Sequence, residues 1–443
     1  MSNQPERLSP FACDRAAETL PARRRGQSSA DQSAPTGRKW LCLMERLSRG
    51  LLRKTMGGLQ LGQMVLEQGA ESERFGNLSE VALSGHVRVL APRFYRRILT
   101  DGVLGAAESY LEGEWVSDEL TDVFRVLLKN EHVIAKFSSS LTWISNLRHR
   151  VQHFRNRNSR AGSRRNIHEH YDLGNSFFEL FLDPSMMYSS AIFPSEQASL
   201  EEGSMEKVDR ACRQLQLKPT DDLIEIGTGW GTLAIHAASR YGCRVTTTTI
   251  SDEQFRMATQ RVAAAGLEDR VTVLKRDYRD LTGSYDKLVS IEMIEAVGRR
   301  YLPGYFEKCS SLLKDDGAML IQAIVLPEQR YAGYEESVDF IQKYIFPGGF
   351  LPTVSMMQQF VAEKTPLRML ALDDFGMHYA RTLRLWNERF HEQLDAVRAL
   401  GFDERFIRMW RYYLCYCEAA FLERAIGLVQ VLWAKPGSSL GSA

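Results

Sequence analysis

Short apolar runs alternate with amphipathic segments along the chain from Thr220 onward. Runs rich in Ile, Val, Leu and Thr predict strands, and segments with apolar residues at helical spacing predict helices. The predicted strands are DLIEIG (222–227), CRVTTTTI (243–250), VTVLKRDY (271–278), YDKLVSIEM (285–293) and GAMLIQAIVL (317–326), and the helices are TLAIHAASRY (232–241), DEQFRMATQRVAAAG (252–266) and YLPGYFEKCSSLLK (301–314). This alternation implies right-handed βαβ units, so we predict an α/β fold with a Rossmann-like, doubly wound sheet. Ligands bind such sheets at the carboxyl ends of the strands.

The part of the chain before this alternation divides into three segments. Residues 1–39 are rich in Ser, Pro, Ala, Gln and Arg without a steady apolar period, so we expect a disordered tail. In residues 40–142, GHVRVLAP has strand character, whereas LGAAESYLEGEW and LTDVFRVLLKN have helical spacing. This pattern predicts a small N-terminal α+β domain. A basic linker over 143–168 then leads into a large domain over 169–438.

The linker carries a run of arginines with no acidic residue before Glu169. Its arginines are Arg148, Arg150, Arg155, Arg157, Arg160, Arg164 and Arg165. Two interpretations stay open: a solvated connection between domains, or docking on anionic phospholipid, to which each basic residue adds about 1 kcal/mol.

Charge, cysteine content and hydropathy narrow the function classes. The 443 residues have a formal net charge of +1, which excludes a globally basic nucleic-acid binder. Seven scattered cysteines, an odd number, indicate a reduced, cytoplasmic protein. No apolar run approaches the ~20 residues that span a bilayer, so we expect any contact with lipid at the membrane surface.

The strand DLIEIG leads into a glycine-rich turn, EIGTGWG, which predicts a cofactor site. Gly227 and Gly229 allow the backbone to approach a ligand, although a tight structural turn would use the same residues. The spacing G-x-G-x-G and the acid Glu225 favour S-adenosylmethionine over a dinucleotide. A carboxylate suits the ammonium group of its methionine part, whereas it would repel a pyrophosphate.

The ends of the next two strands supply further candidates for the cofactor site. Thr249 and Ile250 end one strand, and Gln254 follows on the helix as a partner for ribose hydroxyls. Tyr278 and Arg279 follow the next strand, where an aromatic ring could cover the adenine.

Four segments in this order give the chain a specific resemblance. They are HYDLGNSFFELFLDPSMMYSS (170–190), EIGTGWG (225–231), SIEMIEAVG (290–298) and YIFPGG (344–349), and HYARTLRLW and YYLCYCEAAF extend the match. The chain resembles the cyclopropane fatty acid synthases and the related mycolic acid methyltransferases over about residues 104–435. The resemblance implies methyl transfer from S-adenosylmethionine to a cis alkene of an acyl chain, followed by proton loss and ring closure. The small N-terminal domain favours a phospholipid as the substrate.

The resemblance also assigns site residues. Cofactor contacts fall on Tyr188 and Ser189, in addition to the glycines and strand-end residues named above. Family members hold a bicarbonate ion as the base with Cys, Glu, His and Tyr. Glu295 and Tyr379 match the Glu and the Tyr, and Cys417 matches a further cysteine near that pocket.

Two positions depart from the family pattern. Ser190 stands where the family has Cys, and Gln322 stands where it has His. Both can still donate hydrogen bonds to a carbonate oxygen, but the loss of an imidazole alters proton handling near the base. A methyl- or methylene-branched product is therefore the alternative to the cyclopropane. A binding module that has lost catalysis, and a methyltransferase for a small soluble substrate, are weaker alternatives.

Aromatic and apolar residues of the matching segments have two interpretations. Phe177, Tyr344, Phe346 and Gly348 belong either to ordinary core or to an acyl tunnel, with His170 as a pocket residue. No Cys, His or Asp cluster has metal-site spacing, so we expect no metal. As partners we expect unsaturated phospholipid acyl chains at the inner face of the membrane and no nucleic acid, and a homodimer stays open.

Overall fold

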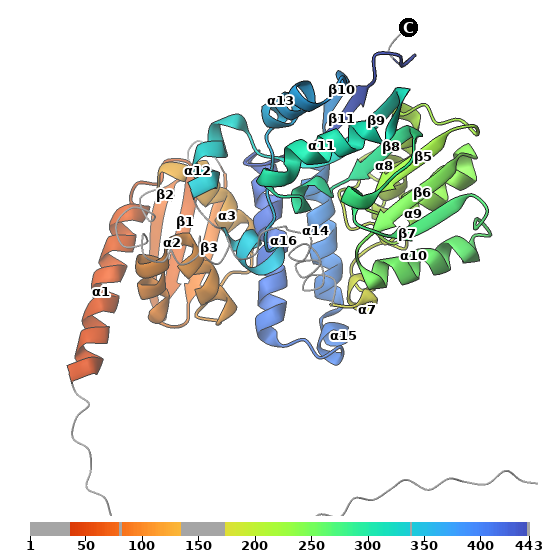
Figure 1. The fold of residues 1–443 in the computed structure, drawn as a ribbon. Helices are drawn as coiled ribbons and strands as arrows, with labels where there is room; N and C mark the ends of the chain where they lie inside the picture. The colour runs from red at the N-terminus through yellow and green to blue at the C-terminus, as the bar shows by residue number, and fades with distance from the viewer. Residues whose placement is uncertain (1–35, 79–81, 134–172, 337–338, 441–443) are drawn as a thin grey trace, which may run out of the picture. The chain divides into compact units, whose positions relative to one another are not determined.

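The computed structural model describes residues 36–78, 82–133, 173–336 and 339–440 (Figure 1). The chain divides into two compact units, residues 1–43 and 44–443. Helix α1 (Thr36–Met56) begins inside the tail that was predicted to be disordered. The arginines of the predicted linker lie outside the described residues.

A sheet of seven strands forms the centre of the large domain, in the order β10-β11-β9-β8-β5-β6-β7. Neighbouring strands from β9 to β7 are parallel, whereas β11 runs antiparallel to both of its neighbours. The strands are β5 (Asp222–Ile226), β6 (Arg244–Thr249), β7 (Val271–Lys275), β8 (Tyr285–Ile291), β9 (Leu313–Val325), β10 (Arg368–Asp374) and β11 (Gly427–Ala434). The five predicted strands and the predicted fold class are thus confirmed. The pair β10 and β11 was not predicted.

Helices cover both faces of this sheet because successive strand residues point to opposite sides. Leu223 and Leu320 pack on α8 (Leu200–Gln214), α9 (Thr232–His236) and α10 (Asp252–Ala264). Their chain neighbours Ile224 and Ile321 pack on α11 (Leu302–Ser311) and α13 (Val354–Lys364). Strand order reverses between β5 and β8, so their carboxyl ends border the crevice where such folds bind ligands.

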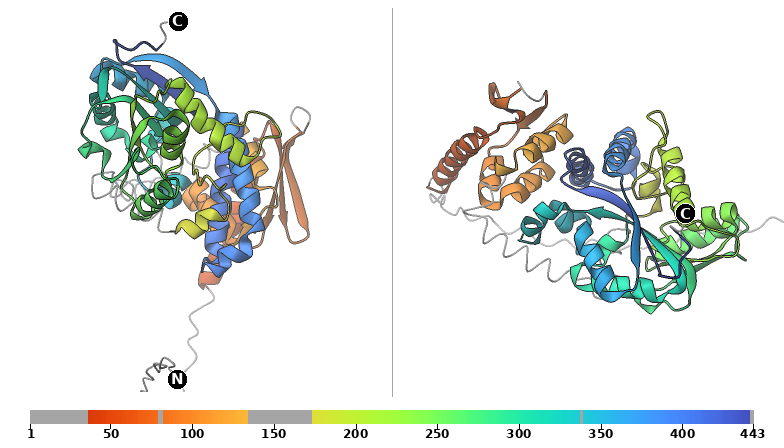
Figure 2. Two further views of the ribbon diagram at one scale, coloured as in Figure 1. Left: turned by 90° about the vertical axis from the view of Figure 1, so that its right-hand side faces the viewer. Right: turned by 90° about the horizontal axis from the view of Figure 1, so that it is seen from above.

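Helices α14 (Gly376–Glu392) and α16 (Glu404–Leu422) lie side by side at the end of the large domain that carries the predicted site (Figure 2). Helix α16 also packs on α3 (Leu120–Lys129) of the small domain. The remaining short α-helices of the described large domain are α7 (Asn175–Glu179), α12 (Tyr331–Glu336) and α15 (Leu394–Ala399).

The small domain is a four-stranded mixed sheet with helices. Its strands have the order β2-β1-β3-β4, and β1 pairs parallel with β3. Its elements are β1 (Gly62–Gln68), β2 (Glu71–Asn77), β3 (Ser84–Val89), α2 (Arg93–Leu111), β4 (Trp115–Val116) and α3 (Leu120–Lys129). The strand predicted around Val87 and the two predicted helices are confirmed.

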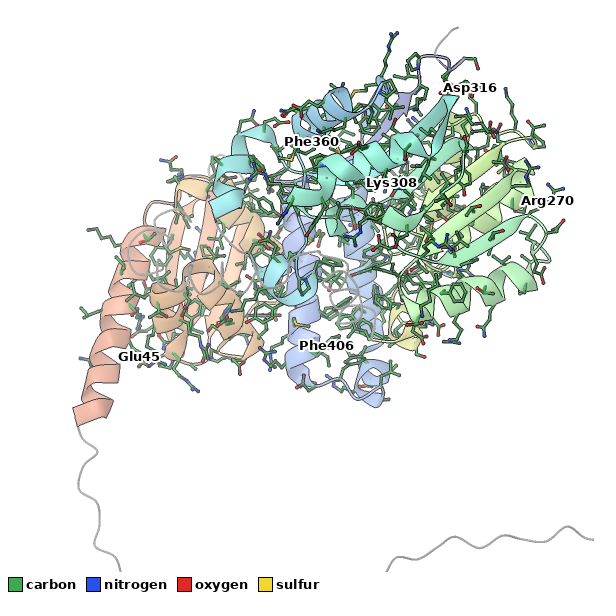
Figure 3. All side chains as sticks on the ribbon, in the orientation of Figure 1. Glu45, Arg270, Lys308, Asp316, Phe360 and Phe406 are labelled. Atoms are coloured by element: carbon green, nitrogen blue, oxygen red, sulfur yellow. The ribbon has the colours of Figure 1, made fainter. Side chains whose placement is uncertain are left out.

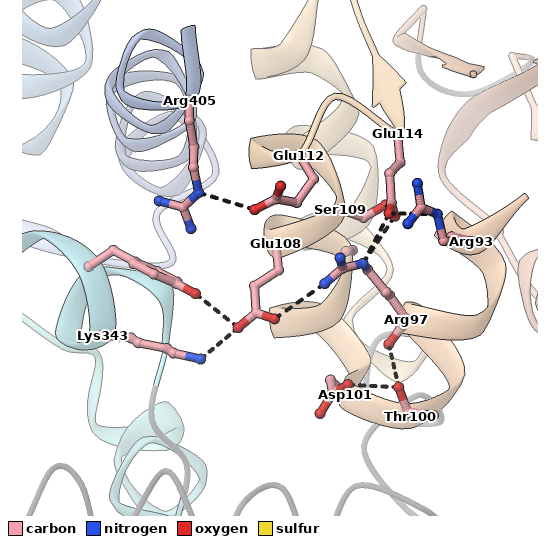
Figure 4. A network of polar contacts seen from close by, with 12 residues as sticks. Arg93, Arg97, Thr100, Asp101, Glu108, Ser109, Glu112, Glu114, Lys343 and Arg405 are labelled. Carbon is pink, nitrogen blue, oxygen red and sulfur yellow. Dashed lines mark hydrogen bonds and ion pairs between the residues drawn. The ribbon is translucent and has the colours of Figure 1, made fainter. Parts of the chain in front are cut away.

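Two acidic residues, Glu108 of α2 and Glu112 directly after it, connect the two domains through ion pairs (Figure 4). The Glu108 carboxylate accepts a hydrogen bond from Lys343 Nζ at 2.6 Å and one from the Tyr344 hydroxyl at 2.9 Å. Glu112 accepts from Arg405 Nε of α16 at 3.1 Å. The YIFPGG segment and α16, both parts of the large domain, are therefore tied to the small domain by charge-assisted hydrogen bonds.

Candidate active site

The turn after β5 requires its three glycines. Gly227, Gly229 and Gly231 have φ angles of +101°, +52° and +90°. A Cβ at Gly227 would lie 3.2 Å from the Met293 side chain, and one at Gly231 would lie 3.3 Å from Ala258. A Cβ at Gly229 would meet no atom within 4 Å, so the turn has open space at its tip. A cradle of this kind fits a ligand that packs directly on the backbone.

A cavity of about 930 Å³ opens over this turn and the neighbouring strand ends. All predicted cofactor residues line it: Tyr188, Ser189, Glu225, Gly227, Gly229, Thr249, Ile250, Gln254, Tyr278 and Arg279. They come from the carboxyl ends of β5, β6 and β7 and from the segment before α8. This is the edge of the sheet at which the sequence predicted a ligand.

The predicted cofactor residues form one wall of the cavity, the cofactor wall, and hydrogen bonds hold its polar side chains in place. The Thr249 hydroxyl donates to Gln254 Oε1 at 2.8 Å, which fixes the amide at the start of α10. Asp277 accepts from Arg279 Nη2 at 2.6 Å, and the guanidinium lies 5.5 Å from the centre of the Tyr278 ring. The buried Thr228 hydroxyl has no hydrogen-bond partner among the described residues. The wall therefore offers an amide, a carboxylate and hydroxyls to a polar ligand such as a nucleoside.

Glu225 is the buried acid of the cofactor wall. Its Oε2 accepts a hydrogen bond from the Thr247 hydroxyl at 2.5 Å. Burial raises the pKa of Glu225 to about 8. A cationic group placed beside it would favour the ionised form. The donor set thus fits S-adenosylmethionine, whose methionine part carries an ammonium group.

A second group of polar side chains surrounds Glu292, directly after β8. Its Oε1 accepts from the Ser190 backbone N–H at 2.9 Å and from Gln322 Nε2 at 2.7 Å. Its Oε2 accepts from the Tyr379 hydroxyl at 2.7 Å. Glu292 has a φ angle of +47°, a backbone conformation that costs a side-chain-bearing residue about 1–3 kcal/mol. The sequence prediction missed this residue, although SIEMIEAVG places two acids directly after a strand.

Glu295 also lines the cavity, one turn beyond Glu292. Its Oε1 accepts from the Ile324 backbone N–H at 2.6 Å, whereas its buried Oε2 has no hydrogen-bond partner within the described part of the chain. Burial, together with the nearby charge of Glu292, raises the pKa of Glu295 to about 8. A developing positive charge in the cavity would be stabilised by this carboxyl group in its ionised form.

Lys207 is a buried cation on the far side of Ser189, and the sequence prediction did not include it. Its Nζ donates to the Ser189 hydroxyl at 2.5 Å, and its side chain is fully buried. Burial lowers the pKa of Lys207 to about 8, against the opposing attraction of Glu292 and Asp183. Glu292, Glu295 and Lys207 thus form a polar centre of two acids and a lysine beside the cavity.

The other predicted site residues fall into two groups. Tyr379, Cys417 and Phe346 line the cavity with Glu295. Ser190, Gln322, Phe177, Tyr344 and Gly348 are absent from its lining. Ser190 and Gln322 lie behind Glu292, and the Ser190 hydroxyl donates to the Ala191 carbonyl at 2.9 Å. His170 lies outside the described residues.

Phe177 lies in an aromatic cluster between α7 and α16 rather than at the cavity. It is 0 % exposed, and its ring centre lies 4.9 Å from that of Trp410 and 5.3 Å from that of Phe406, which is labelled in Figure 3. The surroundings of Phe177 are therefore those of a core residue, whereas Phe346 borders the cavity.

The cavity continues from the polar centre into the small domain as an apolar arm. Its walls there come from β1–β3, α2, α3 and the end of α1, and they include Leu52, Met56, Met64, Leu66, Phe75, Val87, Phe94 and Ile98. Tyr412, Tyr416 and Cys417 of α16 also line the cavity. Polar residues at one end and apolar side chains at the other suit an amphiphilic substrate with a long hydrocarbon part.

The described ranges also bear on metal binding and on membrane spanning. No group of three or more His, Cys, Asp or Glu side chains there could hold a metal ion. Every helix in the same ranges is too short or too polar to cross a bilayer.

The chain is similar in sequence and in structure to known proteins. The chain is 43% identical over 333 residues to tuberculostearic acid methyltransferase UfaA1 of Mycobacterium tuberculosis, covering 74% of this chain and 77% of the relative. It is 38% identical over 356 residues to the cyclopropane-fatty-acyl-phospholipid synthase of Escherichia coli, covering 79% and 87%. The solved mycolic acid cyclopropane synthase CmaA1, complexed with SAH and CTAB, superposes with a TM-score of 0.58 at 29% identity, over 61% of this chain and 98% of that one.

The family profile agrees with these relatives and extends over more than half of the chain. It describes mycolic acid cyclopropane synthetases and matches residues 158–431. The match includes the glycine turn, both glutamates after β8 and the helices α14 and α16. The chain belongs to this family of cyclopropane synthases and is an S-adenosylmethionine-dependent C-methyltransferase.

Proposed function

We propose that the enzyme transfers a methylene group from S-adenosylmethionine to the cis double bond of an unsaturated acyl chain in a phospholipid, forming a cyclopropane fatty acid. The observation that carries this proposal is one continuous cavity, which joins the glycine turn, the carboxyl groups of Glu292 and Glu295, and the apolar arm. S-adenosylmethionine, when bound, supplies an electrophilic methyl group. An alkene needs no deprotonation before it attacks, so the protein contributes alignment in a dry site, worth about 7–11 kcal/mol when positioning is good.

The proposed roles follow the two walls of the cavity. Glu225 pairs with the ammonium group of the cofactor, and Gln254 and Tyr278 contact its nucleoside part. Glu295 and the Tyr379 ring stabilise positive charge that develops on the acyl chain, because a carboxylate and an aromatic face both attract cations. The Phe346 ring borders the hydrocarbon.

A branched product is the second candidate, and two observations favour it. The relative with 43% identity is named for tuberculostearic acid, and Ser190 and Gln322 depart from the pattern that the resemblance assigns to the base. Cyclopropanation and methylation with proton loss both add CH₂, so the mass of the lipid does not distinguish them.

Mass analysis of lipids before and after catalytic hydrogenation separates these products. We expect lipids from an expressing host to gain CH₂ and to resist mild hydrogenation at the new carbon, as a cyclopropane does. Uptake of hydrogen as by an alkene would establish the methylene-branched product. If purified enzyme transferred no labelled methyl group to unsaturated phospholipid vesicles, with bicarbonate present, a binding module would be the better description.

Binding of S-adenosylhomocysteine, which carries the same ammonium group, should depend on pH through Glu225. With a pKa of about 8, only ~1% of this carboxyl is ionised at pH 6, and the ligand ammonium favours the ionised form. Binding therefore releases a proton, and affinity should rise by up to about tenfold per pH unit between pH 6 and 8. Calorimetric titrations across this range measure the slope. The Glu225→Gln variant should bind S-adenosylhomocysteine more weakly, and its affinity should lose most of the dependence on pH. An unchanged slope of affinity against pH in that variant would assign the released proton to another group.

We also propose that the enzyme acts from the cytoplasm on the inner face of the membrane, with the arginines of 143–168 contacting anionic lipid. Sedimentation with anionic vesicles should be strong at low salt and fall as the screening length drops to ~8 Å at physiological ionic strength. Neutral vesicles are the control, and absence of binding at low salt would favour a small soluble substrate. Light scattering of the same protein measures whether two copies associate.

A further inference from the structure

We infer that the Glu292 carboxylate is the catalytic base that removes the proton from the transferred methyl group, in the place that the family resemblance gives to a bicarbonate ion. This inference rests on the proposed function and deepens it by naming the base. It comes from the three hydrogen bonds that hold this side chain at the wall of the cavity.

The donors around Glu292 are the groups that the resemblance assigns to bicarbonate. Of those matched positions, Ser190 donates its backbone N–H, Gln322 its amide and Tyr379 its hydroxyl, at 2.9, 2.7 and 2.7 Å. A carboxylate and a bicarbonate ion present the same planar pair of oxygens to such donors. Because the side chain already accepts all three hydrogen bonds, this site does not fit the ion.

The two departures from the family pattern agree with a carboxylate at this position. Gln322 is oriented by Gln430, whose Nε2 donates to Gln322 Oε1 at 2.9 Å, so its own Nε2 is directed at Glu292. An amide donates to a carboxylate without a proton that it can lose or gain near neutral pH. Glu292 is then the group that takes up the proton, because no imidazole stands at position 322 to share it.

The local backbone and charge also favour a functional role for Glu292. Its left-handed φ angle of +47° is strained for a residue with a side chain, and strain of this kind concentrates at active sites. Burial raises the pKa of the carboxyl group, whereas Lys207 and the Tyr379 hydroxyl oppose the shift. A carboxylate whose pKa is raised by burial is a stronger base than one in water.

With Glu292 as the base, methyl transfer and proton removal need no further reactant. The alkene electron pair forms the bond to the methyl carbon, and the carbon–sulfur bond breaks with its electron pair on sulfur. The neighbouring alkene carbon is left as a cation. Glu292 then takes one proton from the new methyl group, and the released C–H pair closes the ring onto the cation, or forms a methylene group if a hydride has shifted first. Glu292 ends protonated and returns its proton to solvent after product release.

The test compares wild type, Glu292→Gln and Glu292→Gly on vesicles of dioleoyl phospholipid, with bicarbonate removed or added. Wild type should form product at one rate in both conditions. Glu292→Gln should lose about 100-fold or more of product formation, as expected when a general base is removed. Glu292→Gly should lose as much without bicarbonate and recover at least about tenfold when bicarbonate is added, because the glycine relieves the φ strain and frees the three donors for the ion.

Matched controls keep the outcome interpretable. Glu418→Gln alters another largely buried acid, which accepts from the Thr121 hydroxyl at 2.8 Å outside the cavity lining, and it should leave product formation unchanged. S-adenosylhomocysteine affinity and melting temperature report whether each variant is folded. The inference is overturned if wild type depends on added bicarbonate, if folded Glu292→Gln works near the wild-type rate, or if folded Glu292→Gly shows no recovery. Absence of any product with wild type would instead contradict the proposed function.

Discussion

Replacement of Gly229 by alanine is expected to weaken binding of S-adenosylhomocysteine about tenfold to a hundredfold while the protein stays folded. The φ angle of Gly229 is +52°, which alanine adopts at a cost of about 1–2 kcal/mol, and its added methyl group would meet no protein atom within 4 Å. That open space belongs to the cavity at the tip of the glycine turn. A methyl group forced into a packed ligand site costs about 1–3 kcal/mol.

The matched control is Gly266→Ala in the exposed turn after α10. Gly266 has a φ angle of +65° and also has no atom within 4 Å of an added Cβ, but it does not line the cavity. Both variants should therefore lose a similar, small amount of thermal stability, and only Gly229→Ala should lose affinity in a calorimetric titration. Equal affinity of the two variants would mean that the ligand does not pack on this turn.

Much of the large domain could be predicted from the sequence because each element carries its own periodic signal. The five parallel strands are short apolar runs separated by amphipathic helices, and local pattern alone indicates them. The closing strands β10 and β11 were missed although Gly427–Ala434 is a largely apolar run. Helix α14 and helix α16, with the short α15, separate them along the chain, so no βαβ alternation marks their pairing. The antiparallel course of β11 is a tertiary property.

The candidate site could be predicted where it follows the sheet, and not where distant segments meet. Every predicted cofactor residue lines one cavity because the carboxyl ends of parallel strands share one edge. Glu292 was missed because its hydrogen-bond partners lie far from it in the sequence, before α8, on β9 and on α14. The unusual residues Ser190 and Gln322 were noticed singly, and only the folded chain brings them together on one carboxylate.

Phe177 and Phe346 should respond in opposite ways to truncation, although one interpretation of the sequence assigned both to an acyl tunnel. Phe177→Ala should destabilise the protein by about 3–5 kcal/mol, because the fully buried ring contacts aromatic side chains of α7 and α16 and its removal leaves a cavity. Its melting temperature should fall by several degrees. The KM for unsaturated lipid should change little in the protein that remains folded, since Phe177 does not line the cavity.

Phe346→Ala should show the reverse pattern, with a smaller loss of stability and a clear rise in the KM for lipid. Its ring is only partly buried, lies 6.4 Å from the Tyr188 ring and borders the cavity beside the polar centre. Removing it exposes the hydrocarbon of the substrate to a wider, wetter space, and each methylene that loses its apolar contact costs about 0.8 kcal/mol. Thermal melts and lipid titrations of both variants measure the two effects. A raised KM in Phe177→Ala with unchanged stability would place the acyl chain in the aromatic cluster instead. Truncation of a core residue lowers the stability of the protein, whereas truncation of a residue that contacts substrate raises the KM.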